Sequence, residues 1–60
     1  MFYVTAEPDA ATPTEYRWFV YAYDNPAEPV RRSEYPYSSR SEAIDAGWQV
    51  VAQLESGLDR

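Results

Sequence analysis

The sequence predicts an α+β fold in which a three-stranded antiparallel sheet carries one C-terminal helix packed on one face. Three observations predict this fold. Residues 1–37 contain three segments rich in aromatic and β-branched side chains, separated by proline-containing stretches. Residues 39–57 combine a helix-capping pattern with apolar residues at helical spacing. The connections between the strand segments suit antiparallel pairing, because parallel crossovers need about a dozen residues or more.

The first two strand segments differ in strength. Residues 1–6, MFYVTA, have the composition of a strand. Residues 7–14, EPDAATPT, are expected to form a loop because Pro8 and Pro13 cannot donate hydrogen bonds to a sheet. Residues 15–23, EYRWFVYAY, contain neither Gly nor Pro and form the clearest strand, which we place at the centre of the sheet.

A weaker third strand is expected after a turn. Residues 24–29, DNPAEP, contain two prolines and predict the turn. Residues 30–37, VRRSEYPY, predict the strand. Pro36 indicates that this strand lies at an edge of the sheet or ends there.

The last third of the chain predicts a helix. Ser39 precedes Glu42 by three residues, which is the capping-box spacing, and Gly57 supplies the expected stop. Trp48 lies at the margin of the apolar stripe. Seven residues fall within one stripe of the helical wheel: Ala43, Ile44, Gly47, Val50, Val51, Leu54 and Leu58.

Gly47 stands in the middle of this apolar stripe. A glycine there costs about 1 kcal/mol of helix propensity relative to alanine. We therefore expect the helix to approach something bulky on the sheet at this point, with Trp18 as the natural candidate.

The central strand decides which face of the sheet stays open. Side chains alternate along a strand, so Trp18, Val20 and Ala22 share the face that we assign to the core under the helix. The opposite face then carries an uncovered aromatic row, formed by Phe19, Tyr21 and Tyr23, which Tyr3 is expected to join. Such a patch is typical of an interaction site, although tyrosines are also common on ordinary solvated sheet surfaces.

The composition excludes several kinds of chemistry. Ten acidic residues stand against five arginines, for a net charge of −5, and the chain has no Lys, His or Cys. Disulfides, zinc sites, thiol nucleophiles, histidine bases and lysine Schiff bases are therefore excluded. No cofactor is expected. The chain has neither an apolar run long enough for a membrane helix nor a signal-peptide pattern, so a single soluble cytoplasmic domain over residues 1–60 is expected.

Residues 16–53 resemble the small YegP-like domains. The resemblance implies a compact α+β fold and dimerisation through strands, and it brings no catalytic residues. The turn at residues 24–29 departs from the short Asn-Gly-type turn of that family. The matching positions are Trp18, Val20, Ala22, Ser33, Tyr35, Tyr37, Ser38, Arg40, Ala43, Gly47 and Val51.

Three other kinds of site could use the charged and aromatic residues: a catalytic pair of acids, a metal site and a nucleic-acid-binding surface. The acidic residues lie on a turn, a strand and a helix face, and nothing pairs them in a pocket for catalysis. Asp24, Asn25 and Glu28 lack the glycine and the alternating ligands of a calcium loop, so no metal is expected. Nucleic-acid binding by the aromatic row would draw on Arg17, Arg31, Arg32 and Arg40, but the net charge of −5 opposes phosphate at long range.

A protein partner with a basic surface is the remaining expectation. The small size and negative charge of this chain are similar to those of phage-encoded inhibitors of the anti-CRISPR type. This similarity suggests an inhibitor that blocks a basic nucleic-acid-binding surface of a host complex. The alternatives are a housekeeping YegP-like domain that dimerises through its sheet and a weak nucleic-acid binder. Both monomer and homodimer remain open. The predicted partner-binding residues are Phe19, Tyr21, Tyr23, Asp24, Glu28, Glu34, Glu42 and Asp45.

Overall fold

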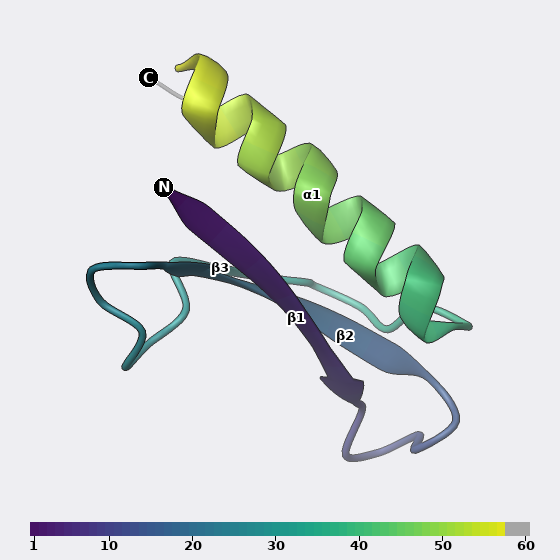
Figure 1. Ribbon diagram of the computed structural model, residues 1–60. Coiled ribbons are helices and arrows are strands. Elements are labelled where there is room, and N and C mark those ends of the chain that lie inside the picture. Colours follow the sequence, from purple (N-terminus) through teal and green to yellow (C-terminus); the bar gives the residue numbers. More distant parts are fainter. Residues whose placement is uncertain (58–60) are drawn as a thin grey trace.

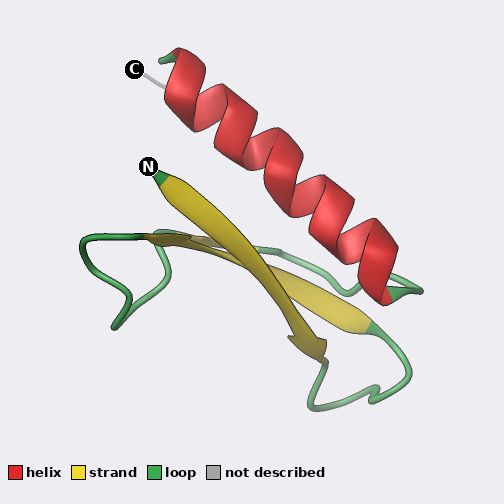
Figure 2. Ribbon diagram, in the orientation of Figure 1, coloured by secondary structure: helices red, strands yellow, loops and turns green. Residues whose placement is uncertain are grey.

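The computed structural model describes residues 1–57 and confirms the predicted α+β fold. Strand β1 spans Phe2–Pro8, β2 spans Tyr16–Ala22, β3 spans Arg31–Arg32, and helix α1 spans Arg40–Ser56. The sheet is antiparallel throughout, in the order β1-β2-β3. The helix runs along one face of this sheet, and the opposite face carries no other element (Figures 1 and 2). In the described part of the chain, no helix is long and apolar enough to cross a membrane.

Strand β1 is longer than the sequence predicted, since it continues through Glu7 to Pro8. The carbonyl of Met1 accepts a hydrogen bond from Tyr23, and the N–H of Asp9 donates to Glu15. The odd-numbered residues of β1 therefore direct their backbone groups toward β2, and the even-numbered ones direct theirs toward the outer edge. Pro8 falls on the outer edge, where its missing N–H removes no ladder hydrogen bond.

Strand β3 is much shorter than the predicted strand over residues 30–37, which was wrong in its extent. Only Arg31 and Arg32 pair regularly with β2. The chain then leaves the sheet and returns at Tyr37, whose N–H and C=O both bond to Tyr16. Pro36 has no N–H to donate at the end of this detour, which agrees with the prediction that the strand lies at an edge or ends there.

Both predicted helix ends are confirmed. Ser39 has extended backbone angles, and its Oγ accepts a hydrogen bond from the N–H of Glu42 at 3.2 Å. The Glu42 carboxylate accepts from the hydroxyl of Ser38 rather than completing the reciprocal half of the capping box. At the other end, Gly57 adopts the left-handed conformation with φ 77°, and its N–H donates to the carbonyls of Gln53 and Leu54.

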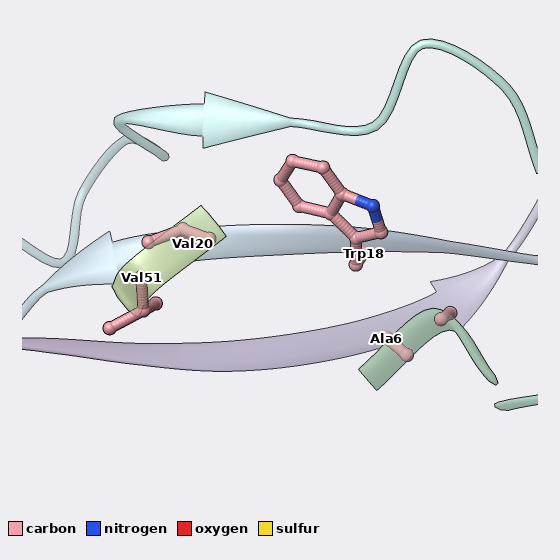
Figure 3. Packing of buried hydrophobic residues seen from close by; sticks show 5 residues of the cluster. Ala6, Trp18, Val20 and Val51 are labelled. Carbon is pink, nitrogen blue, oxygen red and sulfur yellow. The ribbon is translucent and has the colours of Figure 1, made fainter. Parts of the chain in front are cut away.

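The core lies between α1 and the sheet, as predicted for Trp18 and Val20. Both are buried, and Val20 has no exposed surface. Figure 3 shows these two side chains beside Ala6 of β1 and Val51 of α1. Ala22, also assigned to the core, is only half-buried because it is the last residue of β2. Leu58, placed in the apolar stripe, lies outside the described residues.

Gly47 is buried against the sheet, but its nearest neighbour is Val4 rather than Trp18. A Cβ built on Gly47 would lie 2.5 Å from Cγ1 of Val4 and 3.3 Å from Cβ of Trp18. The first separation is far below van der Waals contact. The glycine therefore allows α1 to pack directly over β1 and β2.

Candidate functional site

The face of the sheet opposite α1 carries a cluster of aromatic side chains, here called the aromatic face: Tyr3, Phe19, Tyr21 and Tyr23. Tyr3 of β1 pairs with Tyr21 of β2, so their side chains emerge side by side. Their rings are stacked, with centroids 5.4 Å apart and planes 16° apart. The ring of Tyr23 tilts against Tyr3 with a centroid distance of 4.9 Å. Tyr3 thus joins the row as predicted.

The members of the aromatic face differ in exposure. Phe19 and Tyr21 are half-buried by their neighbours on the sheet, whereas Tyr23 keeps 62% of its surface exposed. Thr5 lies beside Phe19 in the register. Its Oγ1 is buried and has no hydrogen-bond partner within residues 1–57. The exposed surface of the face is therefore greatest at Tyr23, next to the connection between β2 and β3.

The predicted acidic residues do not gather at one place. Asp24 and Glu28 are exposed in the connection between β2 and β3, while Glu42 and Asp45 are exposed on α1. Glu34 lies on a third part of the surface, at the edge of the sheet next to β3. The predicted acidic residues therefore lie on three parts of the surface and do not form one acidic site.

A groove opens at the edge of the sheet between β3 and α1 and has a volume of about 290 Å³. Its apolar wall comes from Trp18, Val50 and Tyr37. Two arginines, one glutamate and a second tyrosine complete the lining. The residues of this edge groove are Trp18, Arg31, Arg32, Glu34, Tyr35, Tyr37 and Val50.

Two phenols form one side of the edge groove. The rings of Tyr35 and Tyr37 lie 5.6 Å apart and are tilted by 36°. A hydrogen bond with Tyr37 raises the pKa of the Tyr35 phenol above its ordinary value of 10.0, and the negative charge of Glu34 acts in the same direction. The Tyr35 hydroxyl therefore stays neutral well above pH 7 and can donate or accept a hydrogen bond on this side of the groove.

Trp18 forms the buried wall of the edge groove. Its side chain is 8% exposed, and Nε1 is closed off from solvent without a hydrogen-bond partner in the described part of the chain. An indole N–H left without a partner costs about 1–3 kcal/mol. The nitrogen is drawn in blue in Figure 3.

A polar network connects the loop after β1 with β2 and with the segment after β3. Oδ2 of Asp9 accepts hydrogen bonds from the backbone N–H groups of Ala11 and Thr12. Oδ1 accepts from Nε of Arg17, whose Nη1 donates to the carbonyl of Ser33 at 3.1 Å. The Arg17 hydrogen bond, with help from both N–H donors, holds the pKa of Asp9 below its ordinary value of 3.8 although burial opposes this.

Two further candidate sites can be compared with the structure: the arginine cluster for phosphate binding and the metal site. The guanidinium of Arg17 is engaged with Asp9 and Ser33, so the Asp9 carboxylate offsets the charge that Arg17 would bring to a phosphate-binding cluster with Arg31, Arg32 and Arg40. Within the described residues, no three metal-ligating side chains come together, and the region around Asp24, Asn25 and Glu28 is no exception.

No family model, curated protein or solved structure matches this chain. The resemblance to YegP-like domains and to phage-encoded inhibitors therefore stays a prediction. The functional assignment must rest on the surface itself, which offers the aromatic face and the edge groove.

The sequence pattern did not predict the edge groove. Tyr35, Tyr37 and the two arginines were interpreted as parts of one continuous strand, in which neighbours alternate between faces. After Ser33 the chain instead leaves the sheet and returns at Tyr37, and this path lets Tyr35 and Tyr37 line the groove next to β3. The only signal in the sequence was Pro36, which marked an irregularity without saying where the side chains go.

Proposed function

We propose that this protein is a non-enzymatic binding protein that contacts a partner protein through its aromatic face. The uncovered tyrosine cluster opposite α1 carries this proposal. Tyrosine is enriched at interface hot spots because it buries a large area and loses little conformational freedom. Tyr3 and Tyr21 are already stacked, so part of the ordering cost of binding is met in the free protein.

The same geometry favours a protein over single-stranded nucleic acid. Base-stacking platforms offer free ring faces to successive bases. Here Tyr3 already contacts both Tyr21 and Tyr23 through its ring. The net charge of −5 also opposes a polyanion.

The negative charge supports a basic partner. Asp24 follows Tyr23 of the aromatic face directly, and Glu28, Glu42 and Asp45 are exposed elsewhere on the surface. Charges at the rim of an interface mainly raise the association rate, while buried aromatics control dissociation. An acidic cytoplasmic protein of this kind, seated on a basic nucleic-acid-binding surface, would act as an inhibitor by competition. In its most specific version, we propose that the protein is an inhibitor of the anti-CRISPR type.

Matched variants test the proposal. Affinity capture from a host lysate compares the wild type with Tyr21→Ser/Tyr23→Ser and with Glu42→Lys/Asp45→Lys. We expect the same protein to be retained by the wild type and the lysine variant, and to be lost with the serine variant. Once the partner is purified, the serine pair should raise its dissociation rate, and the lysine pair should slow association, more at low salt. Undiminished capture by a folded serine variant would refute the aromatic contact.

Self-association through the outer edge of β1 is the second candidate. The N–H and C=O groups of Phe2 and Val4 point to this edge, and no strand within residues 1–57 pairs with them. The edge has no Lys or internal proline to block pairing. Ala6 is almost fully buried, so only the first half of the strand is open. Sedimentation equilibrium over a range of concentrations distinguishes monomer from dimer, and a Val4→Pro variant should abolish any dimer.

A further inference from the structure

We propose that the outer edge of β1 binds an extended basic segment of the partner protein as an additional antiparallel strand. This assignment rests on the basic partner proposed above and specifies how part of that partner binds. The backbone groups of Phe2 and Val4 point to the outer edge, and no strand within residues 1–57 pairs with them. Ala6, the next residue with this orientation, is almost fully buried. The open part of the edge therefore accommodates a segment of about five residues.

Helix α1 places an exposed aromatic side chain beside this open edge. At about 100° per residue, Trp48 and Val50 fall on opposite sides of Gly47, which packs over Val4. Val50 lines the edge groove next to β3, so its side of the helix faces β3. Trp48 therefore turns toward the outer side of β1, and 46% of its surface is exposed. Ile44, one turn earlier on the same side, is half-buried against the core.

An added strand would meet a different surface on each of its two faces. A side chain opposite Val4 shares its face and is directed toward α1, where Trp48 and Ile44 offer apolar contact. The neighbouring side chains point to the other face, beside Tyr3 and the rest of the aromatic face. Arginine suits these positions because its guanidinium group stacks on aromatic rings. The expected segment therefore alternates apolar and basic residues.

The acidic groups near the open part of the edge favour a basic segment. Asp24 is exposed directly after Tyr23, whose N–H donates to the carbonyl of Met1 at the start of β1. On the other face, the end of α1 lies near this start of β1 (Figure 1). The last turns of α1 carry Glu55 and no basic residue, and the C-terminal end of a helix adds partial negative charge. Both faces beside the open edge are therefore negative.

The arginines of the described chain lie away from this open part. Arg17 pairs in the register with Glu7, near the other end of β1. Helix α1 begins near that same end (Figure 1), with Arg40 as its first residue. Arg31 and Arg32 lie on β3, on the far side of β2. A second copy of the chain would bring its own acidic groups to the open edge, so the charges favour a basic segment of another protein over self-association.

The peptide acetyl-Arg-Val-Arg-Val-Arg-amide is the probe, and ¹H–¹⁵N NMR provides two readouts. The first is amide-hydrogen exchange. The N–H groups of Phe2 and Val4 should exchange at least about five-fold more slowly with saturating peptide. The N–H of Tyr3, which already faces β2, should not change. The second readout is the indole N–H signal of Trp48, which should shift saturably, while the buried Trp18 serves as the internal reference.

Modified peptides separate backbone pairing from charge. In the proposed antiparallel pairing, the valine N–H groups point to β1 and the arginine N–H groups point away from it. N-methylation of both valines should weaken binding about ten-fold or more, because hydrogen bonds to Phe2 and Val4 are lost. N-methylation of two arginines is the matched control and should change binding less than about three-fold. The peptide acetyl-Arg-Arg-Arg-Val-Val-amide keeps the charge without the alternation and should bind at least about five-fold more weakly.

Variants of α1 complete the test. Trp48→Gln should weaken peptide binding about five-fold, and Gln49→Ala on the exposed side of α1 is the matched control. The proposal is overturned if exchange at Phe2 and Val4 is unchanged at tens of millimolar peptide. It is equally overturned if the valine-methylated peptide binds as well as the unmodified one, or if Trp48→Gln binds like the wild type. Protection of both N–H groups that rises with protein concentration in the absence of peptide would also overturn it, because a second copy would then occupy the edge.

These measurements need no natural partner, so they are independent of the capture experiment on the aromatic face. A strand contact that fails in the peptide titration, together with loss of capture by the serine variant, would leave the aromatic contact intact. Undiminished capture by the serine variant, together with protection of Phe2 and Val4 by the peptide, would refute the aromatic contact and keep the added strand.

Discussion

Replacing Gly47 by alanine tests how closely α1 approaches the sheet. On an exposed helix this change would stabilise the protein by about 1 kcal/mol. Here the added Cβ would lie 2.5 Å from Cγ1 of Val4, a side chain that is stiff because it is branched at Cβ. The clash can be relieved only by moving Val4 or by lifting the helix from β1.

The magnitude follows from these two opposing terms. Overpacking a close contact typically costs about 1–3 kcal/mol. After subtraction of the propensity gain, Gly47→Ala should destabilise the protein by about 1 kcal/mol, which corresponds to a fall in Tm of about 4–8 °C. Val4→Ala by itself should cost about 1 kcal/mol, because Val4 is only half-buried. A domain of this length is stable by about 3–9 kcal/mol, so all variants should remain folded.

A double-mutant cycle separates the clash from the propensity. In a Val4→Ala background the nearest atom to the new Cβ becomes Cβ of Trp18 at 3.3 Å, so Gly47→Ala should become neutral or stabilising. Urea unfolding monitored by circular dichroism gives the four free energies, and a coupling of about 1–2 kcal/mol is expected. Additive effects of the two substitutions would refute the direct contact. A full propensity gain in the wild type would show that Gly47 does not face the sheet.

Three further perturbations test the core, the helix cap and the polar network. Trp18→Ala should lower the free energy of unfolding by about 3–5 kcal/mol in urea unfolding followed by circular dichroism, and a variant as stable as the wild type would mean that Trp18 is not in the core. Ser39→Ala should lower the free energy of unfolding by about 1 kcal/mol, whereas Ser39→Asp should preserve it, and equal loss in both would rule out the cap. The Asp9 pKa is lowered in the folded protein, so its stabilising contribution is complete above pH 3.8 and disappears as the pH falls through the folded value. Thermal unfolding measured against pH should therefore show an acid loss of Tm that is smaller in Asp9→Asn, and identical profiles would contradict this role.

Patterns that act over a few residues predicted much of the fold. The helix bounds followed from Ser39 and Gly57, whose capping geometry depends only on nearby backbone groups. The burial of Trp18 and Val20 on one face of β2 followed from the two-residue period of a strand. The stacking of Tyr3 on Tyr21 depended on the register of β1 against β2, so the row could be expected while its geometry could not.

The sequence by itself determined that this chain is acidic, contains no Lys, His or Cys, and forms one amphipathic helix after its strand segments. Only the tertiary structure decided which polar groups meet. Asp9 pairs with Arg17 and offsets its charge, although both residues are ordinary surface types in the sequence. The edge groove combines residues from β2, β3, the detour after β3 and α1. Such contacts depend on the path of an irregular segment and on pairing between distant residues, neither of which leaves a periodic signal in the chain.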